Sequence, residues 1–317
     1  MKLPSLSGSA RSGRRRAATW GKSNAMTRFR CFPAVQELIL TGLLIGPFLG
    51  HAQTPVTTES FAYTGGGTIA GASGGTGWAQ SWQGGHLTIG TGGLAFPARE
   101  GGGLAGIASG NDVDYAASDG KQNYSTRQMT TSVDLSKNGV YYASVLLRKS
   151  ASGGSDPDTD QIAVKFFTGS TQRWGFGLNS EENFFVECGP DNPTWTAAAL
   201  DVALNTTYFL VSKLETSAAG YDQWFLSVYG PSNTVPLAEP VSWQLSFSGS
   251  SAATGVDLVR LEYGTYAQGA IDEFRFGSSW SAVTTAIPEP ATYATLAGLT
   301  ALAVAAWRRR QHLFPTS

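Results

Sequence analysis

The chain has 317 residues, of which 42% are hydrophobic and only 14% are charged, and its formal net charge is −1. This balance hides an asymmetry, because basic residues concentrate near both ends: residues 53–286 carry 11 Lys and Arg against 21 Asp and Glu, a formal charge of −10. A body this acidic cannot neutralise phosphate groups, so binding to DNA or RNA is excluded.

The first 25 residues are rich in Arg and Ser and contain no apolar run. A secretory signal normally has a short basic start followed directly by an apolar stretch, and this segment lacks the second part. We therefore interpret residues 1–25 as an upstream extension of the reading frame, with Met26 as the true start.

Residues 26–52 have the three parts of a secretory signal peptide. Arg28 and Arg30 precede an apolar run at 38–50, and small residues follow it. This order is typical of a segment that directs export and is then removed. We expect signal peptidase to cleave between Ala52 and Gln53.

The stretch 53–286 is long enough for one large β-domain, and no Pro- or Ser-rich linker divides it. It is rich in Gly, Thr, Ser and aromatic residues, with short alternating runs between turn-like clusters, which predicts an all-β antiparallel sandwich. The clearest expected strands are residues 140–148, 161–167, 173–178, 183–188, 206–215, 223–229, 256–263 and 269–276.

Two stretches narrow the architecture. The sequence Glu-Ser-Phe-Ala-Tyr at 59–63, followed by Gly-Gly-Thr-Gly-Trp at 74–78 and by Trp82, resembles the opening of concanavalin A-like, laminin-G-like jelly rolls. Ala-Ile-Asp-Glu-Phe-Arg-Phe-Gly at 270–277, followed by Trp280, resembles the last inner strand of the same fold. The resemblance implies that the first and last strands pair in the middle of a sheet.

The acidic residues do not form a recognisable catalytic pair. Glycosidases of this fold place two carboxylates on one face of a strand, whereas here Asp272 and Glu273 are adjacent and Ala270 replaces the needed Glu. Neighbours on a regular strand face opposite ways, so we interpret Asp272 as a structural acid. Glu181 and Glu182 are more typical of a solvated turn. We predict no catalytic residue, although loops could still assemble one.

One segment could hold a metal ion. Asp156, Asp158 and Asp160 alternate in the way that hard cations favour, and jelly rolls of the laminin-G-like type often hold Ca²⁺ in loops, so a Ca²⁺ site is one interpretation and an acidic hairpin tip is the other. Zinc is not expected, because His86 and Cys188 are the only His and Cys between residues 53 and 286. No other cofactor is predicted.

Aromatic residues are the remaining candidates for a ligand site. Trp174 and Trp224 lie in expected strands among apolar neighbours, which predicts that they point into the core. Trp195 ends a segment, 189–195, that has no strand pattern, so we expect an exposed loop. An exposed indole ring can stack on a sugar, which makes Trp195 the predicted ligand contact.

The tail, residues 287–312, has three consecutive features: Pro288-Glu289-Pro290, an uncharged apolar run at 291–307, and the arginines Arg308, Arg309 and Arg310. As a helix, the run would measure about 25 Å, near the lower limit for crossing a membrane. The basic residues after it would stay on the cytoplasmic side. The sequence therefore predicts one transmembrane helix with the body outside the cell membrane.

This order of features resembles the PEP-CTERM sorting signal of Gram-negative bacteria that produce exopolysaccharide. The resemblance implies that an exosortase recognises Pro288, Glu289 and Pro290 and processes the tail. We therefore expect a non-enzymatic exported protein of the cell surface or extracellular (biofilm) matrix, whose jelly roll binds carbohydrate or protein or has a purely structural role. The alternative is a secreted carbohydrate-active enzyme, a glycosidase or lyase, on the same scaffold.

Overall fold

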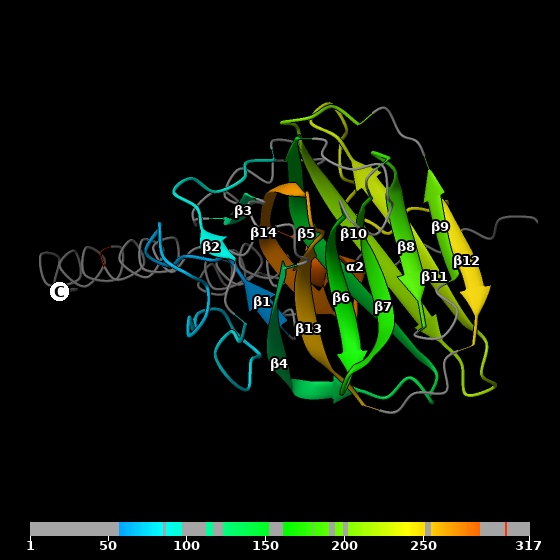
Figure 1. Cartoon of the computed structure of the whole chain (residues 1–317). Coiled ribbons are helices and arrows are strands. Elements are labelled where there is room, and N and C mark those ends of the chain that lie inside the picture. The colour runs from blue at the N-terminus through cyan, green and yellow to red at the C-terminus, as the bar shows by residue number, and fades with distance from the viewer. Residues whose placement is uncertain are drawn as a thin grey trace, which may run out of the picture. The chain divides into compact units, whose positions relative to one another are not determined.

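The computed structural model describes residues 57–84, 87–96, 112–116, 123–151, 161–179, 181–189, 194–198, 202–250, 255–285 and 302. Within these residues, fourteen strands form two antiparallel sheets that pack face to face (Figure 1). The expected all-β antiparallel sandwich is thus confirmed. The described residues include no helix with the length and apolar character that crossing a membrane requires.

The larger sheet has eight strands in the order β12-β11-β10-β5-β14-β3-β2, with β1 also pairing with β14. Its strands are β1 (Thr57–Glu59), β2 (Thr88–Ile89), β3 (Val113–Ala116), β5 (Gly139–Ala151), β10 (Thr207–Thr216), β11 (Asp222–Tyr229), β12 (Leu245–Gly249) and β14 (Gln268–Gly277).

The smaller sheet has six strands in the order β4-β13-β6-β7-β8-β9. Its strands are β4 (Asn123–Val133), β13 (Val256–Tyr263), β6 (Ile162–Thr168), β7 (Thr171–Leu178), β8 (Phe184–Cys188) and β9 (Thr194–Ala198).

The first and last strands pair inside the larger sheet, as the resemblance implied. Thr57 of β1 lies opposite Phe276 of β14, and β14 itself lies between β5 and β3. All eight strands expected from the alternation are present, with ends shifted by no more than a few residues. The alternation did not predict β2, β3, β4, β9 and β12, and β1 was implied only by the resemblance of residues 59–63.

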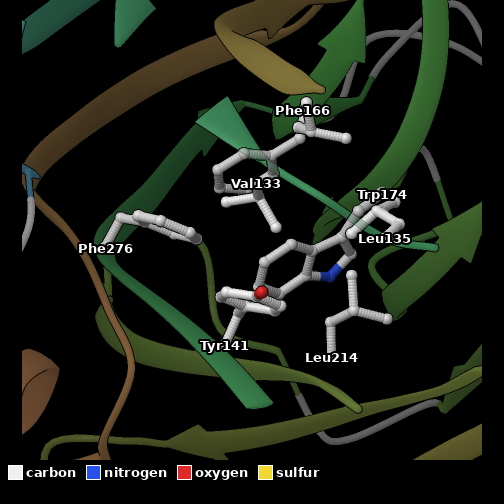
Figure 2. A pocket seen from close by; sticks show the side chains of 8 residues that line it. Val133, Leu135, Tyr141, Phe166, Trp174, Leu214 and Phe276 are labelled. Carbon is white, nitrogen blue, oxygen red and sulfur yellow. The ribbon is translucent and has the colours of Figure 1, made fainter. Parts of the chain in front are cut away.

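The main core lies between the two sheets, because inward-facing residues alternate along each strand. In β6, for example, Ile162, Val164 and Phe166 are fully buried in this core. Trp174 and Trp224 are buried in it as well, which confirms both predictions. This core contains a cavity of about 10 Å³, room for at most one water molecule. Figure 2 shows the side chains around it. Its lining is Val133, Leu135, Tyr141, Phe166, Trp174, Leu214, Val256 and Phe276.

A second apolar cluster covers the other face of the larger sheet. There the short helix α2 (Trp280–Thr284) packs Trp280 and Val283 against β5 and β14, together with Leu94 and Phe96. Ser279 caps the helix by accepting a hydrogen bond from the backbone of Ala282. Part of the outer surface of this sheet is therefore buried.

Candidate functional site

Several residues predicted from the sequence lie outside the described residues. They are the signal-cleavage pair Ala52 and Gln53, the candidate calcium ligands Asp156, Asp158 and Asp160, the motif Pro288, Glu289 and Pro290, and the arginines Arg308, Arg309 and Arg310. The predicted membrane helix at 291–307 also falls there, except for Leu302. Within the described part of the chain, no group of three or more His, Cys, Asp or Glu could hold a metal ion.

Trp195 does not lie in a loop, so that expectation is wrong. It belongs to β9, where it pairs with Glu187 of β8. Pro190 and Pro193 just before this strand are typical of a loop, so the sequence around Trp195 gave no strand signal. The role of Trp195 as a ligand contact stays a prediction.

The residues of the opening motif, 59–63 and Trp82, are joined by hydrogen bonds to the carboxylate of Glu59. This carboxylate is 1% exposed and accepts four hydrogen bonds: from the Phe61 backbone N–H at 3.0 Å, the Tyr63 hydroxyl at 2.7 Å, Trp82 Nε1 at 3.2 Å and Arg127 Nη1 at 2.5 Å. Burial, assisted by the charge of Glu59, raises the pKa of Tyr63 to about 12. The motif residues therefore hold one buried carboxylate at the edge of the sandwich.

Above this network lies a groove with a volume of about 310 Å³, which we call the Arg127 groove. Most of its wall is the loop between β1 and β2, and β4 contributes one residue. The lining residues are Ser73, Gly74, Gly75, Gly77, Trp78, Ala79, Gln80, Ser81 and Arg127.

The glycines let this loop approach the sandwich closely. Gly75 has a φ of +69°, and a Cβ there would lie 2.0 Å from the carbonyl oxygen of Thr58. Trp78 is fixed in turn, because its Nε1 donates to the same carbonyl at 2.9 Å and its ring packs against Trp82 and Phe274. The groove wall is therefore held in a defined position.

Arg127, from β4, is the charged residue that lines the groove. Its side chain is nearly buried, its Nε donates to the carbonyl of Gln80 at 2.7 Å, and its guanidinium carbon lies 4.8 Å from the centre of the Trp78 ring. Nη1 is bound to Glu59. No described residue accepts a hydrogen bond from the other terminal nitrogen, Nη2. Arg127 therefore keeps one donor for a ligand.

The outer face of the smaller sheet carries a second cluster of charges. Lys165 Nζ lies 2.7 Å from Glu262 Oε1 and 3.3 Å from Glu187 Oε1, and all three residues are at most 9% exposed. Glu262 also accepts from Gln161 Nε2 at 2.7 Å. Burial alone would lower the pKa of Lys165, but the two carboxylates raise it above its ordinary value. Lys165 is therefore a charged ammonium between two acids.

Strand register brings these residues together. Lys165 lies opposite Gly175 of β7, which lies opposite Glu187 of β8. A Cβ on Gly175 would be 2.7 Å from Glu187 Oε1, so the absence of a side chain at Gly175 lets Glu187 reach across β7. This cluster could not be predicted from the sequence, because its members come from three strands. Its one visible signal was Lys165 in an otherwise apolar strand.

Asp272 and Glu273 form a third acidic site, and the argument that they face opposite ways is wrong. The pairing of β14 with β5 is irregular between Asp272 and Arg275, and Glu273 has a φ of +51°. Such a bulge directs neighbouring side chains to the same side. Asp272 accepts from the backbone of Leu94, and Glu273 binds Arg275, which donates to Thr285 just after α2. Both acids thus lie on the α2 side.

The expected structural role of Asp272 agrees with its surroundings. The residue is 0% exposed and accepts hydrogen bonds of 2.8 Å from the backbone N–H groups of Leu94 and Glu273. Burial, with the nearby charges of Glu273 and Asp112, raises its pKa to about 8. Asp272 therefore holds a proton at neutral pH, beneath Leu94 and out of reach of a substrate.

The architecture defines the class of the body: an antiparallel β-sandwich of two sheets. Solved structures of similar fold include the receptor binding domain of botulinum neurotoxin type G (7% identity, 71% of this chain, TM-score 0.43), of which the chain spans 48%. A second is an endo-beta-1,4-glucuronan lyase from Trichoderma reesei, with 10% identity, a TM-score of 0.43, and coverage of 69% of this chain and 98% of the lyase. A third is an endo-1,3-beta-glucanase from Streptomyces sioyaensis, with 10% identity, a TM-score of 0.43, and coverage of 70% of this chain and 95% of the glucanase. At these identities the likeness does not extend to an activity.

The sorting signal is identified more specifically. Residues 286–310 match the family described as the PEP-CTERM protein-sorting motif. The chain is thus an exosortase-sorted, exported protein with a β-sandwich body. No curated protein matches the sequence.

Proposed function

We propose that this protein is a non-enzymatic module of the Gram-negative cell surface or extracellular matrix, and that its sandwich body binds carbohydrate. Signal peptidase releases residues 26–52, and the helix at 291–307 holds the chain in the membrane until an exosortase acts on it. The match of residues 286–310 to the sorting motif carries the first part of the proposal.

The Arg127 groove supports the binding role. It combines a half-buried indole, Trp78, with a guanidinium donor and the polar side chains of Ser73, Gln80 and Ser81. An apolar ring beside convergent polar groups is the usual composition of a site for an amphipathic ligand such as a sugar.

Substitution of the motif tests the sorting role. In the native host, the triple change Pro288→Ala, Glu289→Ala and Pro290→Ala is expected to keep the protein in the membrane fraction and off the cell surface. The matched control is Pro315→Ala, which changes a proline beyond the matched segment. Surface delivery of the triple variant at the level of the control would contradict the proposal.

A second candidate function, polysaccharide cleavage, is favoured by one observation. Glu187 and Glu262 each contact Lys165, so their nearest oxygens lie at most about 6 Å apart, close to the spacing of a retaining glycosidase. However, Lys165 occupies the space between them, and a substrate cannot reach carboxylates that are 9% and 2% exposed. We therefore favour a structural role for this cluster.

An activity assay separates the two candidates. The full chain is incubated with neutral and acidic polysaccharides, and new reducing ends and unsaturated ends are measured. We expect no products. Products that disappear in Glu187→Gln but persist in Glu181→Gln, a change at an exposed acid in the preceding turn, would establish the enzyme instead.

A further inference from the structure

We propose that the Arg127 groove is the carbohydrate site and that it selects neutral sugar units over acidic ones. This inference rests on the proposed function, because it specifies the ligand of that binding role.

The size of the groove limits its occupant. About 310 Å³ is at the lower end of ligand-site volumes, which suits one or two sugar rings and not a long chain. The wall is fixed by Trp78 and by the close contact of Gly75 with Thr58, so the groove exists before a ligand binds. A preformed site of this size fits the end or a short branch of a polysaccharide.

Charge then decides between neutral and acidic sugars. Arg127 is the one charged residue among the described lining residues, and Glu59 neutralises it at 2.5 Å. The carboxylate of a uronic acid could therefore accept a hydrogen bond from Arg127, but the positive charge of Arg127 is already balanced by Glu59. The body around the groove carries a formal charge of −10, which repels a polyanion over a screening length of about 8 Å at physiological salt.

Hydrogen bonding favours a hydroxyl-rich ligand. Arg127 Nη2 donates, the side chains of Ser73 and Ser81 donate and accept, and the Gln80 amide does both. Among the described residues, none accepts a hydrogen bond from the backbone N–H groups of Gly75 and Gly77. Sugar hydroxyls, which also donate and accept, match this mixture. The half-buried indole of Trp78 adds only limited apolar contact, because Arg127 lies over its ring and Trp82 and Phe274 pack against it.

A direct change of Arg127 would not test the inference, because Glu59 would be left buried without its cation and the fold could fail. Ala79 is an exposed residue of the groove wall, so Ala79→Trp fills the groove without touching that ion pair. Ala219→Trp is the matched control, since Ala219 is also exposed but lies in the turn between β10 and β11.

The experiment is titration calorimetry of the full chain in detergent. The probes are neutral gluco-, manno- and galacto-oligosaccharides and, as acidic probes, oligogalacturonate and oligomannuronate. We expect at least one neutral probe to bind at least about tenfold more tightly than either acidic probe. We expect Ala79→Trp to weaken that binding at least about tenfold and Ala219→Trp to leave it unchanged.

Other outcomes separate this inference from the proposed function. Acidic probes that bind as tightly as neutral ones, or neutral binding that Ala79→Trp leaves intact, would overturn the inference and leave carbohydrate binding standing. Absence of binding to every probe would overturn both.

Discussion

The replacement Asp272→Asn tests whether the buried acid of β14 holds a proton in the folded protein. The pKa of Asp272 is raised from 3.8 to about 8, chiefly by burial. Between about pH 4 and pH 8 the folded state therefore binds one more proton at this site than the unfolded state. Stability contributed by this group is complete at low pH and is lost as the pH rises through that window.

The size of the effect follows from the shift. Each pH unit in the window costs up to about 1.4 kcal/mol, so the loss at pH 7 relative to low pH is about 4 kcal/mol. The amide introduced by Asp272→Asn would keep a side-chain oxygen that can accept from Leu94 but would not titrate. It would lose the hydrogen bond from either Leu94 or Glu273, a loss of about 1 kcal/mol at every pH.

The assay is denaturant unfolding, followed by tryptophan fluorescence, at a series of pH values from about 5 to about 8. We expect the free energy of unfolding to fall with pH in the original protein and to fall less steeply in Asp272→Asn. Asp134→Asn is the control: its exposed carboxyl has a pKa lowered to about 2 by hydrogen bonds from Ser136 and Lys137, so it does not titrate in this range. Equal slopes for the original protein and Asp272→Asn would refute the reasoning.

Three further predictions concern other parts of the fold. Lys165→Met removes the one ammonium that contacts both acids, leaving Glu187 buried without this partner and Glu262 with Arg260 Nη1 at 3.4 Å. We expect it to lower the free energy of unfolding by about 3–5 kcal/mol, partly restored at acidic pH; an effect as small as that of the exposed Lys137→Met would show that the cluster is not a tight charge network. Gly177→Ala places a Cβ 2.1 Å from the Ile162 carbonyl, so thermal melting should show a large loss of stability, whereas Gly92→Ala, with no atom within 4 Å, should melt close to the original protein. Cys188 is buried, and burial raises the pKa of its thiol to about 11. In a Cys31→Ser variant, which leaves Cys188 as the one thiol, iodoacetamide should therefore label the protein only after unfolding. Rapid labelling of the folded protein would be inconsistent with a closed core.

The sequence predicted best where apolar alternation is regular. The eight strands in which apolar residues alternate regularly were all predicted. The burial of Trp174 and Trp224 was predicted from their apolar neighbours. Strand β4 was missed although it has 11 residues. Its inward positions include Ser125 and Arg127, which are polar and give no apolar signal, although both are buried and Arg127 is paired with Glu59.

The sites were harder to predict, since they depend on register and on one backbone irregularity. The pairing of Lys165 with Glu187 and Glu262 joins residues far apart in the chain. Asp272 and Glu273 lie on the same face of β14 because of a bulge with a positive φ at Glu273. No Gly or Asn stands at this position to predict such a conformation from the sequence.

The measurement that tests the account most directly is the intact mass of the protein from surface and medium fractions of its own host, with and without the exosortase. The account predicts that the tail beyond the segment 288–290 is absent only when the exosortase is present. A mass that always retains the residues up to Arg310 would mean that the tail is a plain membrane anchor, and would contradict the central claim.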